Sequence, residues 1–299
     1  MEPGITLGSF QIRFYGIIIV LAMLIAAGVA SRLAKRDGKD PEHIWGALTW
    51  AIIPGIILAR LWFVFFPPVS LTAGCATAAA TDICRDTGWF LSNFFDLQSG
   101  AIAIWSGGLS IFGAIIGGFL GAYIYMRRNK LQMLPWLDIA GIALPMGQAI
   151  GRWANYINQE LYGSVTSLPW GITIQSASRV APYTSTIDYP VDVTLFHPLF
   201  LYESLWSLLA FIVLLNIYQR YRSSLLSGDV FLFYVMQYSA IRFVLEFLRV
   251  DVTQVAGVNF SQVVCALAFV ASLLYFLYRH RAGAPAPQVP EEAQAANPQ

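Results

Sequence analysis

Residues 12–30 read Ile-Arg-Phe-Tyr-Gly-Ile-Ile-Ile-Val-Leu-Ala-Met-Leu-Ile-Ala-Ala-Gly-Val-Ala, and this stretch decides the fold class. A transmembrane helix needs about 20 mostly apolar residues, and a continuous run predicts a helix because barrel strands alternate apolar and polar side chains. The stretch lacks a basic segment before it and a small-residue cleavage site, so we expect an uncleaved helix rather than a signal peptide. With six similar stretches, the predicted spans are residues 12–30, 44–66, 101–126, 135–157, 198–218, 230–248 and 258–278.

The composition agrees with a polytopic, all-α integral membrane protein. Of 299 residues, 57% are hydrophobic and 12% charged, whereas soluble domains average about 45–50% apolar and about 25% charged residues. The net charge of +1 gives no reason to expect nucleic acid as a partner. Three cysteines are too few for a disulfide scaffold and show no metal-ligand spacing, so we expect no metal and no cofactor.

The distribution of basic residues predicts the orientation. Every second connection between spans is rich in Lys and Arg, and the positive-inside rule assigns these connections to the cytoplasm. We therefore expect the N-terminus outside and the C-terminus in the cytoplasm. The rich set holds Arg32, Lys35, Arg36, Lys39, Arg127, Arg128, Lys130, Arg220, Arg222, Arg279 and Arg281, and the poor set holds Arg13, Arg85, Arg179 and Arg249.

The spans predict one transmembrane domain over residues 1–281. Its two long outer loops cover about residues 67–99 and 158–197. Residues 282–299 are rich in Ala, Pro and Gln, which predicts a disordered cytoplasmic tail.

Two of the cysteines fall in the first outer loop. Cys75 and Cys84 are expected in an oxidising compartment, where a disulfide is stable. Spacing alone does not show that the two sulfur atoms meet, so paired and free thiols both stay open. Cys265 lies in the last span, where we expect it to pack as a small apolar residue.

Charged residues interrupt the apolar spans. They are Arg60, Arg152, Glu203, Arg242 and Glu246, and the predicted topology places all of them in the outer half of the membrane. Such groups are costly at membrane depth and usually face a bundle interior or a water-filled cavity. We therefore expect them to converge on one region.

Helical spacing gathers the polar groups further. The fourth span carries Gln148, Arg152, Asn155 and Gln159 on one face, and the sixth carries Tyr238, Arg242, Glu246 and Arg249. One Arg–Glu pair alone would indicate a structural ion pair, but three arginines at one depth favour a polar cavity for an anion. Phospholipid head groups are the abundant anions in the outer leaflet of a membrane, and Arg binds phosphate through paired hydrogen bonds.

Small residues and one acid complete the pattern. Gly113, Gly117 and Gly121 form small-xxx-small pairs that let a neighbouring helix approach closely. The Gly107–Gly108 pair predicts an irregular or closely approached backbone. Asp138 lies at the cytoplasmic start of its span, where a carboxylate suits the helix dipole.

Residues 151–163, Gly-Arg-Trp-Ala-Asn-Tyr-Ile-Asn-Gln-Glu-Leu-Tyr-Gly, closely resemble the signature of bacterial prolipoprotein diacylglyceryl transferase. A run of thirteen residues is far more specific than a lone glycine motif. The resemblance extends in order through residues 13–16, 105–109, 197–203 and 242–251.

The resemblance implies an activity and a location. The family transfers the diacylglyceryl group of phosphatidylglycerol to the lipobox cysteine of a prolipoprotein signal peptide and releases glycerol phosphate, the first step of lipoprotein maturation. It is a seven-helix enzyme of the bacterial inner membrane, with its site toward the outer face. The implied partners are phosphatidylglycerol, the prolipoprotein and the bilayer.

The resemblance also assigns roles by motif position. Its phosphatidylglycerol-binding arginine falls on Arg152, its essential tyrosine on Tyr15 and its second important arginine on Arg242. We expect further substrate-binding groups around these residues. They are Asn155, Glu160, Gly163, Tyr238, Glu246, Glu203, Arg60, Gly107 and Gly108.

The general base is left open. Many family members have histidine where this chain has Phe112, so a mechanism that uses that histidine does not apply. His197 is the one outer-face histidine in the predicted topology, but it precedes Pro198, a favoured first helical residue, and equally serves as a helix cap. Glu203 and Tyr15 are the competing candidates.

Two other functions fit part of the pattern. Another phospholipid-dependent membrane transferase would use the same arginines, and only the extended motif separates it. A transporter for an anionic solute predicts internal repeats and polar groups through both leaflets, whereas this chain concentrates them in one half.

Overall fold

The computed structural model describes residues 4–7, 10–67, 69–72, 84–104, 107–250, 252, 254–255 and 258–281. The chain divides into two compact units. The large unit comprises Met1–Asp37 with Leu134–Gln299, and the small unit comprises Gly38–Met133. Trp105, Ser106, Cys75 and the tail 282–299 lie outside the described residues, and so do the predictions made for them.

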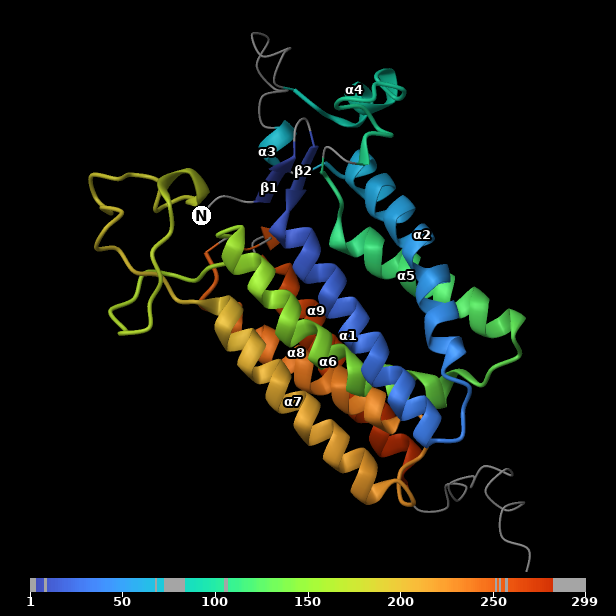
Figure 1. The fold of residues 1–299 in the computed structure, drawn as a ribbon. Coiled ribbons are helices and arrows are strands. Elements are labelled where there is room, and N and C mark those ends of the chain that lie inside the picture. The colour runs from blue at the N-terminus through green and yellow to red at the C-terminus, as the bar shows by residue number, and fades with distance from the viewer. Residues whose placement is uncertain are drawn as a thin grey trace, which may run out of the picture. The chain divides into compact units, whose positions relative to one another are not determined.

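The large unit is a helical bundle with two short hairpins (Figure 1). Strands β1 and β2 pair antiparallel and lead into the first helix, and strands β3 and β4 pair in the same way before the last helix. Its elements are β1 (Gly4–Leu7), β2 (Phe10–Arg13), α1 (Phe14–Arg36), α6 (Met133–Ile157), η3 (Ser176–Ser178), α7 (Leu199–Tyr221), α8 (Asp229–Leu245), β3 (Gln254–Val255), β4 (Val258–Asn259) and α9 (Phe260–Arg279).

Small residues bring the helices of this bundle together. A methyl group added at Gly147 of α6 would lie 3.2 Å from the Ala26 Cβ of α1. The Ser204 hydroxyl of α7 donates to the Ala149 carbonyl of α6 at 2.7 Å. Helix α6 is therefore held closely between α1 and α7, which fixes where its polar stripe lies.

The small unit contains α2 (Glu42–Phe65), α3 (Val69–Thr72), α4 (Thr87–Ser92) and α5 (Ile111–Arg128). Helices α2 and α5 form its main contact. Any side chain at Gly113, Gly117 or Gly121 would overlap the α2 backbone, which confirms the predicted close approach along the small-xxx-small face.

One predicted span begins ten residues too early. The prediction started it at Ala101, whereas α5 starts at Ile111. Gly107 and Gly108 have φ of 92° and 69°, a left-handed conformation that a helix cannot continue through. The described residues before α5 form irregular backbone whose carbonyls turn toward Arg60.

Five helices of the described chain are long and apolar enough to cross a membrane, namely α1, α2, α6, α7 and α9. Helices α5 and α8 have 18 and 17 residues, near the lower limit of about 17 for a span. The architecture is thus that of a helical, multi-pass membrane protein. The two hairpins, and the helices α3 and α4 within residues 67–99, were not predicted.

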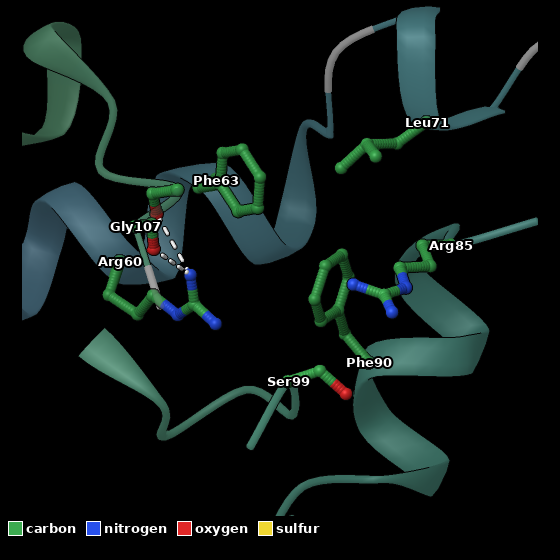
Figure 2. A pocket seen from close by; sticks show the side chains of 8 residues that line it. Arg60, Phe63, Leu71, Arg85, Phe90, Ser99 and Gly107 are labelled. Atoms are coloured by element: carbon green, nitrogen blue, oxygen red, sulfur yellow. Dashed lines mark hydrogen bonds between the residues drawn. The ribbon is translucent and has the colours of Figure 1, made fainter. Parts of the chain in front are cut away.

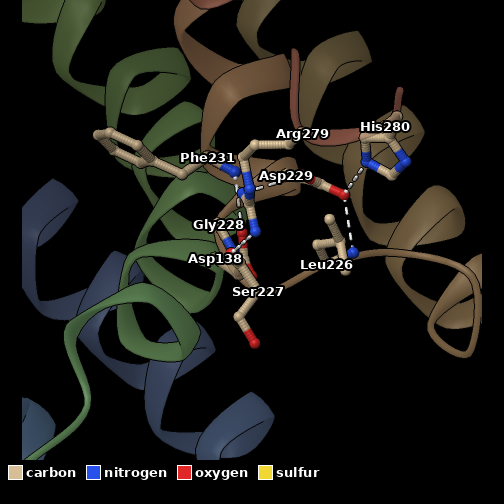
Figure 3. Close-up of polar contacts among 8 residues, drawn as sticks. All are labelled: Asp138, Leu226, Ser227, Gly228, Asp229, Phe231, Arg279 and His280. Atoms are coloured by element: carbon tan, nitrogen blue, oxygen red, sulfur yellow. Dashed lines mark hydrogen bonds and ion pairs between the residues drawn. The ribbon is translucent and has the colours of Figure 1, made fainter. Parts of the chain in front are cut away.

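At the end of the large unit away from Arg152, two buried aspartates hold helix ends (Figure 3). Asp138 accepts the amides of Gly228 and Phe231 at 2.6 and 3.0 Å. Its carboxylate therefore caps α8, and not only the start of its own helix as predicted. Asp229, fully buried, accepts from Arg279 and His280 at 3.1 and 2.8 Å, which ties α9 to α8.

The cysteine predictions have separate outcomes. Cys84 takes part in a disulfide, and Cys75 lies outside the described residues. Cys265 is free and lies in α9.

Candidate functional site

A chain of ion pairs crosses the large unit between three helices. Arg152 of α6 contacts one carboxylate oxygen of Glu203 at 2.5 Å, and Arg242 of α8 contacts the other at 2.9 Å. Arg242 also contacts Glu246 at 2.9 Å, and Arg249 lies 3.7 Å from the same carboxylate. The structure thus brings together four of the five charged residues predicted to converge, Arg152, Glu203, Arg242 and Glu246, whereas Arg60 lies in the small unit with other partners.

The glutamates of this network are more deeply buried than its arginines, and they are fewer. Glu203 and Glu246 are only 5% and 3% exposed, whereas the arginine side chains keep 13–20% of their surface. Three guanidinium groups share two carboxylates, so the network holds one positive charge in excess. Since the accessible edge is cationic and the anionic side is covered, the network is suited to bind an anion.

Further hydroxyl groups surround Arg152. The Tyr238 hydroxyl is hydrogen-bonded to its guanidinium, and Tyr15 of α1 lies within electrostatic range of both Arg152 and Glu160. Asn155 donates to Glu160 at 2.9 Å. Tyr15 and Tyr238 thus lie near Arg152, and Asn155 is linked to the same region through Glu160.

Gly163 and His197 join the helix ends by their backbones. The Gly163 amide donates to the His197 carbonyl at 2.9 Å, and Ser164 donates to Leu248 at 2.7 Å. A side chain at Gly163 would come within 2.7 Å of the His197 Cβ and 3.0 Å of the Leu248 carbonyl. This junction connects the ends of α6 and α8 to the start of α7, and so holds Arg152, Arg242 and Glu203 at one level.

The His197 imidazole has its own partners. Its Nδ1 lies 3.1 Å from the Tyr202 hydroxyl, which accepts a hydrogen bond from the Trp170 indole at 2.9 Å. Sequence reasoning missed Tyr202 and Trp170, although Tyr202 lies inside the motif 197–203. The base role of His197 stays a prediction.

Residues 158–197, predicted to be the second outer loop, have a core that the sequence pattern did not reveal. Tyr162, Ile174 and Phe196 are buried against one another. Arg179, 5% exposed, donates to the carbonyls of Ile174 and Tyr189 at 2.9 and 2.5 Å. The segment therefore packs around its own core, and the Gly163–His197 hydrogen bond joins its two ends.

Arg60 belongs to the small unit and has a different environment (Figure 2). Its guanidinium donates to the carbonyls of Gly100, Ala101, Gly107 and Gly108 at 2.6, 2.8, 2.6 and 3.0 Å. Most of its N–H groups are thereby used by the protein itself. The substrate-binding roles predicted for Arg60, Gly107 and Gly108 stay predictions, and these contacts favour a structural role.

A cavity of about 210 Å³ opens beside Arg60. Phe63 and Phe90 line it, with ring centroids 5.4 and 5.8 Å from the Arg60 guanidinium carbon. In the loop that follows α4, the Gln98 amide and the Ser99 hydroxyl donate hydrogen bonds to Asp96. These bonds hold the pKa of its carboxyl below the usual value. Phe112, the residue that the sequence resemblance aligns with a histidine, packs on Trp62 at 5.9 Å between ring centroids.

The comparisons with known proteins give one family. The model for prolipoprotein diacylglyceryl transferase matches residues 4–278. The chain is 36% identical to the phosphatidylglycerol–prolipoprotein diacylglyceryl transferase of Chloroflexus aggregans, over 95% of this chain and 90% of that protein. The proteins of the same name from Thermotoga maritima and Gloeobacter violaceus are 34% and 32% identical, over 91% and 96% of this chain and 82% and 99% of theirs.

Proposed function

Because the chain belongs to the prolipoprotein diacylglyceryl transferase family, as the match over residues 4–278 shows, we propose that it is a transferase of lipoprotein biosynthesis. It transfers the diacylglyceryl group of phosphatidylglycerol to the thiol of the lipobox cysteine in a prolipoprotein signal peptide. The proposal is based on the cationic network in which Arg152 and Arg242 share Glu203.

The proposal includes a location. The enzyme spans the bacterial inner membrane seven times as one domain over residues 1–281, with its N-terminus outside and its disordered tail in the cytoplasm. Basic connections such as residues 127–130 support the cytoplasmic side of this arrangement. The ion-pair network lies near the outer ends of α6 and α8, so phosphatidylglycerol of the outer leaflet is the substrate in reach.

The reaction exchanges one bond for another. The cysteine sulfur forms a bond to the terminal glycerol carbon of the diacylglyceryl group, and the bond from that carbon to the phosphate oxygen breaks. The electron pair leaves on glycerol phosphate. Arg152 and Arg242 bind this phosphate and stabilise the charge that develops on the leaving oxygen, which is commonly the largest contribution to catalysis.

The thiol proton needs an acceptor, because the thiolate is the nucleophile. His197 is the candidate carried over from the sequence, and Tyr15 and Glu203 are the alternatives. The cationic groups of the network favour the thiolate once the peptide is bound. Asn155, Glu160 and Tyr238 orient Arg152, while Gly163 keeps the helix ends in register.

The direct test uses the purified protein, phosphatidylglycerol labelled in its acyl chains and a lipobox peptide. We expect a thioether adduct that carries the label, detected by mass spectrometry, and equimolar release of glycerol phosphate. A peptide with serine in place of the cysteine is the control and stays unlabelled. Absence of the adduct, or equal transfer from phosphatidylethanolamine, would contradict the proposal.

A further inference from the structure

Two polar contacts, one helical turn apart, join α6 and α8 at the candidate site. The first is the hydrogen bond between the Arg152 guanidinium and the Tyr238 hydroxyl. The second lies four residues earlier on both helices, where Gln148 Nε2 donates to the Tyr234 hydroxyl at 2.9 Å. Residues four apart lie on the same face of a helix, with a rise of about 6 Å between them. The second contact is therefore the next one along the same helix–helix seam.

The two tyrosines connect these contacts. The rings of Tyr234 and Tyr238 are stacked, with 6.2 Å between their centroids and 21° between their planes, a separation at which aromatic rings attract each other. The two helices also approach closely here, since a methyl group added at Gly141 would lie 3.1 Å from the Phe231 Cα and 3.4 Å from the Tyr234 Cβ. Tyr234 is thus packed against α6 and hydrogen-bonded to it, and its ring supports the ring of Tyr238.

The Gln148 amide contributes little to the stability of the fold. Its Oε1 is buried and has no hydrogen-bond partner among the residues that the structure describes. An unpaired buried acceptor costs at least as much free energy as one hydrogen bond returns. The bond from Gln148 to Tyr234 is therefore close to neutral for folding, and its effect is to fix the position of the Tyr234 side chain.

The orientation of Arg152 matters for the chemistry assigned to it. A guanidinium binds phosphate through two N–H groups in one plane, so the direction of this plane decides whether both bonds form. Glu203 contacts the guanidinium at Nη2, at 2.5 Å. The Tyr238 hydroxyl is a second partner from another helix, and two partners fix the plane of the group where one partner leaves it free to turn.

We propose that Gln148 and Tyr234 are positioning residues for the transfer reaction. They hold the Tyr238 ring, and the Tyr238 hydroxyl in turn orients the Arg152 guanidinium toward the phosphate of the donor. The assignment rests on the proposed function, and neither residue needs to touch a substrate.

The first test removes the ring of Tyr234. In Tyr234→Leu we expect kcat to fall roughly tenfold, because a misplacement of about 1 Å at a reacting group costs up to about 10²-fold. The KM for phosphatidylglycerol stays within about twofold, because the charge of Arg152 is still present in the ground state. Phe233→Leu is the matched control, because Phe233 lies on the same helix but packs on Phe276 of α9, at 5.1 Å between ring centroids. Its kcat stays at the wild-type value when all variants are assayed well below their unfolding midpoints.

The second test removes only the hydrogen bond, from either end. Gln148→Met keeps the length of the side chain, and Tyr234→Phe keeps the stacked ring. We expect the same loss in kcat, about threefold, in each variant and in the double variant, because all three lack the same bond. The unfolding midpoint of Gln148→Met stays within about 2 °C of the wild-type value, since this variant also removes the unpaired Oε1.

The third test asks whether the effect passes through Arg152. Lysine carries a point charge that has no plane to orient. In an Arg152→Lys background, the further change Tyr234→Leu should therefore leave kcat within about twofold. A purely structural role of Tyr234 would instead lower kcat by the same factor in both backgrounds.

Several results would overturn the assignment. They are a wild-type kcat in Tyr234→Leu, an equal loss in Phe233→Leu, and a tenfold loss that persists with Arg152→Lys. A full rate in Gln148→Met beside a lowered rate in Tyr234→Phe would remove Gln148 from it. If the wild-type protein forms no thioether adduct, the proposed function itself is wrong, whereas an active wild type with unaffected variants removes only the positioning role.

Discussion

Arg60 of the small unit and the pair Arg152 and Arg242 of the large unit are held by different kinds of partner. In the small unit, Arg60 is surrounded by neutral backbone carbonyls that use four of its hydrogen bonds. In the large unit, Arg152 and Arg242 are held by carboxylates and keep part of their surface accessible. The first arrangement saturates the donors of the guanidinium, and the second positions guanidinium groups while leaving positive charge in excess.

The two kinds of partner correspond to two uses of arginine, a residue that is costly to bury. A guanidinium whose donors are already used by the backbone stabilises an irregular segment, because each carbonyl it binds would otherwise be unpaired. Guanidinium groups held on shared carboxylates are oriented but not neutralised, so they remain able to bind phosphate. Substitutions in the large-unit network should therefore affect transfer, and substitutions around Arg60 should affect stability.

The largest effect is expected for Arg152→Gln. Loss of this charge removes a donor to the leaving phosphate, and we expect transfer to fall about 10²–10³-fold. The measurement is the rate of thioether formation on the peptide, with folding checked by gel filtration. Arg222→Gln is the matched control, because Arg222 also pairs with an aspartate whose side chain is buried, Asp37, but is itself largely exposed. We expect the transfer rate of this variant to stay within about twofold of the wild-type rate. If Arg152→Gln lowers the transfer rate by less than tenfold, Arg152 does not bind the leaving phosphate.

Arg60→Ala should act on stability instead. Its four carbonyl partners lose a charged donor, which we expect to cost about 3–4 kcal/mol of unfolding free energy. Arg85→Ala in the same pocket is the control. The Arg85 guanidinium lies over the Trp89 ring at 4.9 Å, a contact worth about 0.5–1 kcal/mol. The readout is the thermal unfolding midpoint in detergent. An unchanged midpoint with a raised KM for phosphatidylglycerol would instead support the substrate-binding role predicted from the sequence.

The contrast between these arginines could be predicted only in part. Arg152 and Arg242 each lie in a polar stripe with helical period, so local spacing identified them. Glu203 as the bridge between them depends on how α6, α7 and α8 pack, and no local pattern encodes that. The helix predicted from Ala101 failed because apolar residues extend across 101–104, while the Arg60 hydrogen bonds that hold this backbone irregular are not visible in hydropathy.

His197→Asn tests the base in the large unit, with a smaller expected effect. A free thiol with a pKa near ~8.5 is about 3% ionised at pH 7, so loss of the base costs at most roughly thirtyfold. The rate should recover as the pH rises toward ~8.5, because the peptide thiol then ionises by itself. Tyr202→Phe removes the hydroxyl partner of His197 and keeps the imidazole, so it should cost less. A full rate for His197→Asn at pH 7 would leave Tyr15 or Glu203 as the base.

The smallest expected effect is on stability, and it has opposite signs at two neighbouring glycines of the small unit. Gly117 faces the Pro54 carbonyl so closely that a methyl group would overlap it, whereas a methyl group at Gly118 would meet only the Ala51 carbonyl at 3.9 Å. We expect Gly117→Ala to lower the unfolding free energy by about 1–3 kcal/mol through overpacking. Gly118→Ala should raise it by about 0.5–1 kcal/mol, because alanine loses less backbone entropy in a helix than glycine. Below the unfolding midpoint both variants should transfer at the wild-type rate, and a selective loss of transfer in Gly117→Ala would show that the α2–α5 contact contributes to the chemistry as well as to stability.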